Sequence, residues 1–264
     1  MPCIFCGADA KLSREHVFPQ WLRELFPDLG EADYLRRIVT FSTDEHHVRS
    51  GPPFDVVVRD VCRDRNHGWM ERLETQARPI LTPMLQDEPR VLTALEQHVV
   101  ATWATKTMLT MQGANIGGER IVGADRYRWF YENQTPISVS YVWLCRYSDR
   151  TRWLLSIHQW GMTVVPGAEG PPSPDGAMNG FGVVYAIGPL TFWLFGYDLP
   201  GDLQTSANSD DAHLLIWPAL GPDVRWPPRQ TLEREAQLDE LAQRMPAGTH
   251  VHDKPSVPPL SAAP

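Results

Sequence analysis

The sequence predicts an α+β protein with a small N-terminal unit, a helical connector and a larger domain of mainly antiparallel strands. Three of the four cysteines lie in the first quarter of the chain, which sets the N-terminal unit apart. The ten Trp and 24 Pro indicate a body rich in strands and loops. Its short strands are separated by turn residues rather than helices, which favours antiparallel pairing. The 264 residues suffice for one or two domains with a sizeable core.

The N-terminal unit is expected to span residues 1–78 and to contain one clear strand and two short helices. Residues 55–61 are rich in β-branched side chains, which are typical of a strand. The first helix follows Pro19, which suits a first helical position, and a second helix begins near Asn66. The polar segment 42–50 predicts a solvated loop that carries His46 and His47. The apolar residues at helical spacing in this first helix are Phe18, Trp21, Leu22, Leu25 and Phe26.

The connector, residues 79–118, is expected to be dominated by one helix over residues 89–112. Its apolar side chains recur every three to four residues, and Gly113 is a plausible helix end. Lys106 lies on this helix, and we expect a surface lysine whose stem covers apolar neighbours, with a place in a groove as the alternative. The recurring apolar residues are Leu92, Leu95, Val99 and Trp103.

The larger domain is expected over residues 119–230, followed by a C-terminal segment over residues 231–264. Residues 232–245 predict a surface helix, and the Pro-rich remainder predicts a disordered tail. Short β-branched or aromatic runs bounded by Gly, Pro, Asn and Asp predict strands at 137–145, 153–158, 183–187 and 191–195.

Composition excludes several classes of protein. With 42% hydrophobic and 21% charged residues the chain is not disordered throughout. No apolar run approaches the ~18–20 residues of a membrane helix, and the N-terminus lacks the pattern of a signal peptide. A cytoplasmic protein with reduced cysteines is therefore expected. The net charge of −8 argues against a surface that attracts nucleic acid everywhere, but it leaves room for a local basic patch.

A cysteine pair at the N-terminus predicts half of a zinc site. Cys3 and Cys6 are two residues apart and Gly7 follows, so both thiolates can reach one tetrahedral ion from a tight turn. A redox role would need a preceding strand, for which Met1 and Pro2 leave no room. The remaining alternative is a pair of plain buried cysteines.

The second half of this site is incomplete. Cys62 is followed by Arg65 at the position where a fourth sulfur would stand, and arginine stays protonated and cannot ligate zinc. A site with three sulfurs binds zinc more weakly than a site with four. Either another ligand completes it, or the site has lost its metal and its cysteines only pack in the core. The candidates for the fourth ligand are His67, Asp64, Cys145 and water.

Between the two cysteine halves lies the sequence Glu15-His16-Val17-Phe18-Pro19. A carboxylate can bind a divalent ion while a neutral imidazole activates water against a phosphodiester. Residues 1–78 contain the motifs Cys-x2-Cys, Glu-His-x-x-Pro and Cys-x2-x-Asn in this order. This order resembles that of the His-Asn-His (HNH) endonuclease family, which has a ββα-metal fold.

This resemblance implies roles for particular residues. His16 would be the general base and Glu15 a carboxylate close to a catalytic Mg²⁺ or similar ion. Asn66 would be a further ligand of that ion, with His67 as a possible addition, and a structural zinc would staple the unit. The family's middle Asn would fall near Val57, where this chain has none. The implied partner is nucleic acid, expected to be DNA.

Arginines supply the expected contacts to nucleic acid. Arg14, Arg63 and Arg65 lie next to the motifs, although ordinary surface ion pairs are the alternative for such residues. Two other functions compete with a nuclease. One is a catalytically inactive module that binds nucleic acid or protein, and the other places the activity in residues 120–230, which hold no catalytic motif. The wider basic face would comprise Arg36, Arg37, Arg59, Arg63 and Arg65.

Overall fold

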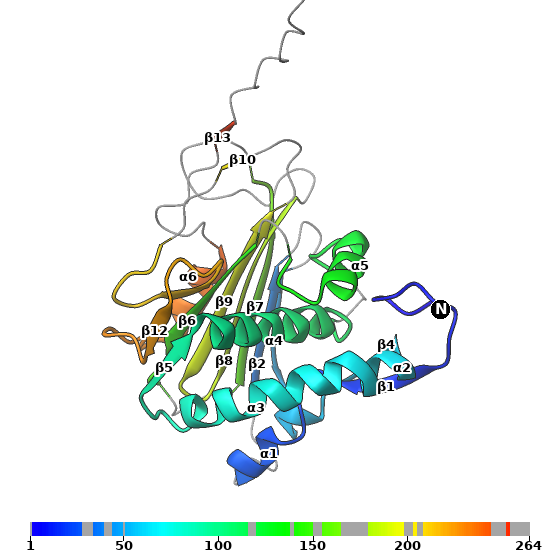
Figure 1. Ribbon diagram of the computed structural model, residues 1–264, viewed down its shortest axis with the longest axis horizontal. Coiled ribbons are helices and arrows are strands. Elements are labelled where there is room, and N and C mark those ends of the chain that lie inside the picture. The colour runs from blue at the N-terminus through cyan, green and yellow to red at the C-terminus, as the bar shows by residue number, and fades with distance from the viewer. Residues whose placement is uncertain are drawn as a thin grey trace, which may run out of the picture.

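The computed structural model describes most of the chain. The described residues are 2–27, 34–39, 44–49, 51–115, 120–137, 140–149, 155–164, 179–197, 203–204, 208–243 and 252–253. They form an α+β structure dominated by one large sheet (Figure 1). No helix within these ranges has the length and apolar character to cross a bilayer.

Seven strands of the described residues form this sheet, in the order β11-β6-β9-β8-β7-β2-β3. Neighbouring strands are antiparallel, except that β2 and β7 run parallel. The strands are β2 (Tyr34–Val39), β3 (Asp44–Arg49), β6 (Ser140–Arg146), β7 (Leu155–Met162), β8 (Gly180–Ile187), β9 (Leu190–Tyr197) and β11 (Leu214–Trp217).

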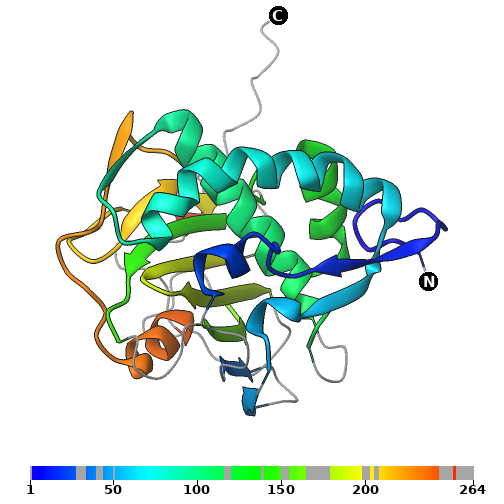
Figure 2. The same ribbon diagram turned by 90° about the horizontal axis from the view of Figure 1, so that it is seen from below.

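Helices cover the sheet on both faces. Every residue of β8 and β9 is buried, as expected for strands in the middle of a covered sheet. Tyr185 on β8 belongs to the cluster beneath α4 (Ala94–Gln112), and its neighbour Val184 belongs to the cluster beneath α6 (Glu235–Gln243). Figure 2 shows α6 on one side of the sheet and the other long helices on the opposite side.

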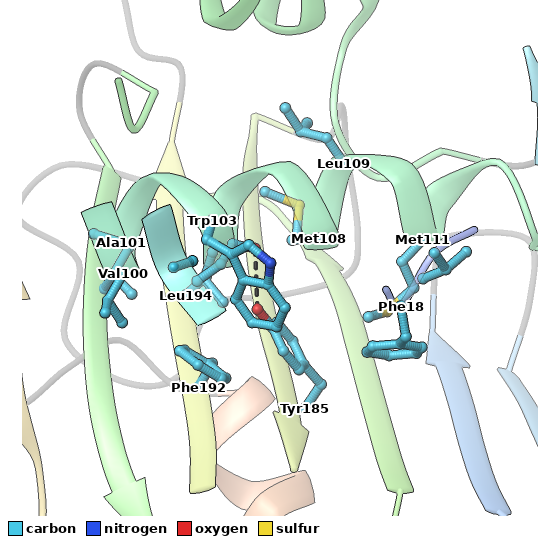
Figure 3. Packing of buried hydrophobic residues seen from close by; sticks show 14 of the residues in the cluster. Phe18, Val100, Ala101, Trp103, Met108, Leu109, Met111, Tyr185, Phe192 and Leu194 are labelled. Atoms are coloured by element: carbon cyan, nitrogen blue, oxygen red, sulfur yellow. Dashed lines mark hydrogen bonds between the residues drawn. The ribbon is translucent and has the colours of Figure 1, made fainter. Parts of the chain in front are cut away.

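The centre of the larger core lies between α4 and the sheet (Figure 3). The ring of Trp103 lies 5.6 Å from that of Phe192, and the hydroxyl of Tyr185 donates a hydrogen bond of 3.1 Å to the carbonyl of Ala104. A capping box at Thr93 fixes the start of α4, because the side chain of Glu96 accepts from the backbone of Thr93. The helix is therefore held both at its start and along its buried length.

The N-terminal residues form a hairpin-like pair of strands followed by helices. β1 (Leu12–His16) pairs antiparallel with β4 (Val57–Cys62), and the chain then continues through α2 (Arg63–Arg65) and η3 (Asn66–Met70) into α3 (Glu71–Leu85). Between β1 and β4 the chain forms α1 (Leu22–Leu25), β2, β3 and η2 (Pro53–Asp55). Residues 1–78 thus contribute two strands to the large sheet, and one hydrophobic cluster runs from Cys3 to Trp226.

Smaller elements complete the fold. β5 (Arg90–Thr93) pairs with β12 (Asp223–Trp226), and β10 (Leu203–Gln204) pairs with β13 (His252–Asp253). α5 (Ala124–Asn133) contributes Tyr127 and Phe130 to the larger core.

The predicted α+β class and the antiparallel pairing of β6, β7, β8, β9 and β11 are confirmed.

Two sequence predictions are wrong. The helix expected from residue 89 begins at Ala94, because residues 90–93 pair with β12. The loop expected at 42–50 contains β3, whose polar sequence suits an edge strand with an exposed side. Most of the tail predicted to be disordered lies outside the described residues.

Gly182 on β8 lets α6 approach the sheet closely, and this contact can be tested. A Cβ at this position would lie 2.0 Å from the carbonyl oxygen of Ala242, so Gly182→Ala must push α6 outward. We expect a loss of about 1–3 kcal/mol in the free energy of unfolding, measured by urea titration. Gly221→Ala is the control, because a Cβ there meets no atom within 4 Å. Equal urea midpoints for the two variants would contradict this packing.

Candidate functional site

Three of the predicted zinc ligands come together at the N-terminal end of the structure. The sulfurs of Cys3, Cys6 and Cys62 all lie within 4.8 Å of one another, and those of Cys6 and Cys62 are 3.7 Å apart. The backbone N–H of Cys62 points to the sulfur of Cys3 at 3.4 Å. Gly7 adopts a φ of +69° directly after Cys6, which is the tight turn that the spacing predicted. The three cysteines are therefore close enough to hold one metal ion.

The turn between the cysteines is anchored by packing. Phe5 is fully buried, and its ring lies 5.4 Å from that of Tyr127 and 6.1 Å from that of Trp69. The backbone N–H of Ile4 donates to the carbonyl of Asp60 on β4 at 2.9 Å. These contacts hold the first two cysteines against the strand that ends in Cys62, so the thiols are brought together by the fold itself.

No described side chain that the sequence predicts as a fourth ligand joins the three sulfurs. Cys145 lies on β6 in the cluster beneath α6, whereas the three other cysteines belong to the cluster beneath α4. Asp64 is exposed, and within the described part of the chain only Cys3, Cys6 and Cys62 form a group of metal-ligating atoms. The side chains of Arg65, Asn66 and His67 lie outside the described residues. Their backbone forms the end of α2 and the start of η3.

His16 lies at the end of β1, where it lines a cleft of about 560 Å³. Side chains from β1, from the segment around α1 and from α3 surround this cleft. The side-chain amide of Gln20 lies 3.2 Å from Nε2 of His16 and restrains the imidazole ring. The charged residues of the lining are Arg14, Glu15, Glu24, Glu71, Glu74 and Arg78, so the cleft is mostly acidic.

The environment of His16 favours the neutral imidazole. Burial lowers the pKa of His16 below its ordinary value of 6.5, and the positive charges of Arg23 and Arg14 lower it further. The carboxylate of Glu74 acts in the opposite direction without reversing the shift. At neutral pH the ring can therefore accept a proton, which is the property required of a general base.

Glu15, the neighbour of His16 on β1, also lines the cleft but is buried. Its carboxylate lies 3.2 Å from the ammonium nitrogen of Lys106 on α4, and Glu74 on α3 lies 2.7 Å from the same nitrogen. Lys106 is fully buried, which corrects the prediction of a surface lysine. Burial alone would lower the pKa of Lys106, but the two carboxylates outweigh that effect and raise it, so the amine stays charged.

The sequence predicts neither partner of Glu15. Glu74 lies in no motif, and the usual behaviour of lysine favours a surface position for Lys106. A signal was nevertheless available for Lys106, because residues 100–112 are almost all uncharged and a helix without a polar face is buried on all sides. A lysine inside such a helix needs a carboxylate partner.

The arginines expected to contact nucleic acid fall at different places. Arg14 lines the cleft beside His16, whereas Arg63 is exposed and does not line it. Arg36 is buried and donates to the carbonyl of Ala114 after α4, and Arg37 pairs with Asp239 on α6. The wider basic face is therefore wrong for Arg36, which is buried, and Arg37 instead makes the ion pairs named as the alternative, with Asp239 and Asp44.

The contribution of Lys106 to stability can be measured by removing its charge. Lys106→Met leaves Glu15 and Glu74 without their shared cation, and we expect a loss of about 3–5 kcal/mol in the free energy of unfolding. Lys11→Met is the matched control, because Lys11 is exposed and the chemical change is the same. A loss within 0.5 kcal/mol of the control would contradict the buried ion pairs. Urea titration at neutral pH measures both variants.

Comparison with known proteins adds no function by similarity. No family model matches the chain, and neither the curated proteins nor the solved structures contain a significant match.

Proposed function

We propose that the cleft at the end of β1 hydrolyses phosphodiester bonds of nucleic acid, with His16 as the general base. The observation that carries this proposal is a neutral imidazole that lines a cleft next to an arginine, Arg14. The resemblance to HNH endonucleases supports it, because the antiparallel pair of β1 and β4 precedes α3 along the chain, as two strands precede the helix in a ββα-metal fold. DNA is the proposed substrate, as that resemblance implies.

The residues of the cleft divide the chemical work as follows. His16 takes a proton from the attacking water, and Gln20, whose side-chain amide lies 3.2 Å from Nε2, keeps the ring in place. Arg14 and Arg78 are the cations that can meet phosphate oxygens. Arg78 also pairs with Glu24 at 2.6 Å and lies over the ring of Trp21, so it is held at the rim.

The catalytic divalent ion implied by the resemblance does not fit the described side chains. Its expected ligand Glu15 is buried and paired with Lys106, and Glu74 shares the same ammonium group. The other expected ligands, Asn66 and His67, have side chains outside the described residues. The proposed mechanism therefore uses no metal ion bound at Glu15.

A structural zinc at Cys3, Cys6 and Cys62 is the second part of the proposal. Such an ion would cross-link the N-terminus to the end of β4, and its binding free energy would add to the stability of the fold. His67 and water remain the candidates for the fourth ligand. The arrangement of the three sulfurs supports this part of the proposal.

The role of His16 is tested by nucleic acid cleavage. We expect His16→Ala to reduce the cleavage rate about 10²–10⁴-fold while the fold stays intact, because general-base catalysis contributes about that much. The pKa of His16 is lowered from its ordinary value of 6.5. The wild-type cleavage rate should therefore fall only when the pH is lowered below 6.5, where the imidazole becomes protonated. The assay follows plasmid and single-stranded DNA at low salt, with and without added Mg²⁺.

The control for this assay is His47→Ala, which removes a histidine on β3 away from the cleft lining. Equal rates for wild type and His16→Ala would remove His16 from the mechanism. Binding of DNA without any cleavage would favour the alternative function, an inactive binding module. The acidic lining of the cleft and the pairing of Glu15 with Lys106 are the observations that favour this alternative.

The zinc proposal is tested by metal analysis of the purified protein. We expect one zinc per chain in the wild type and in Cys145→Ser, and loss of zinc in Cys6→Ser and Cys62→Ser, because only the latter two remove a clustered sulfur. Chelation should lower the melting temperature of the wild type but not that of Cys62→Ser. An unchanged zinc content in Cys62→Ser would place the metal elsewhere.

A further inference from the structure

We propose that the ammonium group of Lys106 is a built-in cation between Glu15 and Glu74 that takes the place of a divalent metal ion at these carboxylates. The native cleft would then bind no divalent ion through Glu15. This inference goes beyond the proposed function, since it concerns what the cleft binds rather than what it cleaves.

The geometry places one cation between two acidic groups from different elements. The ammonium nitrogen of Lys106 lies 2.7 Å from an oxygen of Glu74 on α3 and 3.2 Å from an oxygen of Glu15 on β1. Both carboxylates line the cleft that contains His16, whereas Lys106 does not line it. The ammonium group therefore reaches the carboxylates from the core side, while the cleft borders them on the other side.

A hard divalent ion would need the same oxygens. Mg²⁺ and Mn²⁺ bind carboxylates, and two carboxylates that border one cleft are typical ligands for them. With Lys106 in place, such an ion would meet another positive charge within a few ångströms, and the two carboxylates would already be half neutralised.

The ammonium group cannot easily leave this position. Lys106 is fully buried on α4, which packs between α3 and the sheet, so the side chain has no path to solvent without opening the core. The ion pairs with the two carboxylates also hold it there. Lys106 is therefore a positioning residue, which holds Glu15 and Glu74 without touching the cleft.

Titration with Mn²⁺ tests the inference on the whole protein. Zinc is first added to saturate the cysteines, and the electron paramagnetic resonance signal of free Mn²⁺ then reports how much is bound. We expect no site in the wild type that depends on Glu15. Lys106→Ala should gain one bound Mn²⁺ per chain and a melting temperature that rises with Mn²⁺, because the cation between the two carboxylates is gone and its space becomes available.

Two variants make the assignment specific. Lys11→Ala should behave as the wild type, and the triple variant Lys106→Ala, Glu15→Gln, Glu74→Gln should lose the gained site. A wild-type Mn²⁺ site that disappears in Glu15→Gln would overturn the inference. A folded Lys106→Ala that gains no Mn²⁺ would overturn it as well.

The wild-type titration decides the question alone if Lys106→Ala does not fold. None of these measurements uses nucleic acid, so a failure to detect cleavage would count against the proposed function and leave this inference standing. Conversely, a Glu15-dependent Mn²⁺ site in the wild type would overturn the inference while leaving His16 as the proposed general base.

Discussion

A buried ammonium group imposes a strict requirement on its surroundings, and Lys106 imposes it on three elements at once. Removing a charge from water costs several kcal/mol unless opposite charges meet it at hydrogen-bonding distance. Glu15 and Glu74 satisfy this requirement, so β1 and α3 are held at fixed distances from α4. Glu15 and the next residue, His16, both line the cleft, so the ion pair that fixes β1 lies directly beside the candidate base. The position of His16 thus depends on this ion pair.

The two candidate sites of the N-terminal region depend on different forces. The cysteine cluster is assembled by aromatic packing around Phe5 and by backbone hydrogen bonds to β4, so the sulfurs meet before any metal is considered. The cleft around His16 depends on charge. An acidic cleft repels the phosphates of nucleic acid, and Arg14 and Arg78 offset this repulsion only at the rim. Strong dependence of nucleic acid binding on salt follows from this arrangement.

The sequence predicted those parts of the structure that are determined locally. Helical periodicity placed the end of α4 at Gly113, β-branched runs placed β8 and β9, and cysteine spacing identified the group that Cys62 completes. It failed where partners lie far apart along the chain. The strand β3 looked like a loop because its polar sequence suits an edge, and only pairing with β2 shows that it is a strand. The uncharged stretch around Lys106 indicates its burial, but its partners Glu15 and Glu74 could not be identified, because they are 91 and 32 residues away.

The parallel neighbours β2 and β7 have a consequence for the synthesis of the chain. β2 ends at Val39, but its partner β7 is complete only at Met162, so a ribosome must add more than 120 residues before the two can pair. Until then β2 and β3 have an unpaired edge, which can pair with other chains. Contacts of such long sequence separation also slow folding. Newly made chains should therefore need protection from aggregation until the centre of the sheet has emerged.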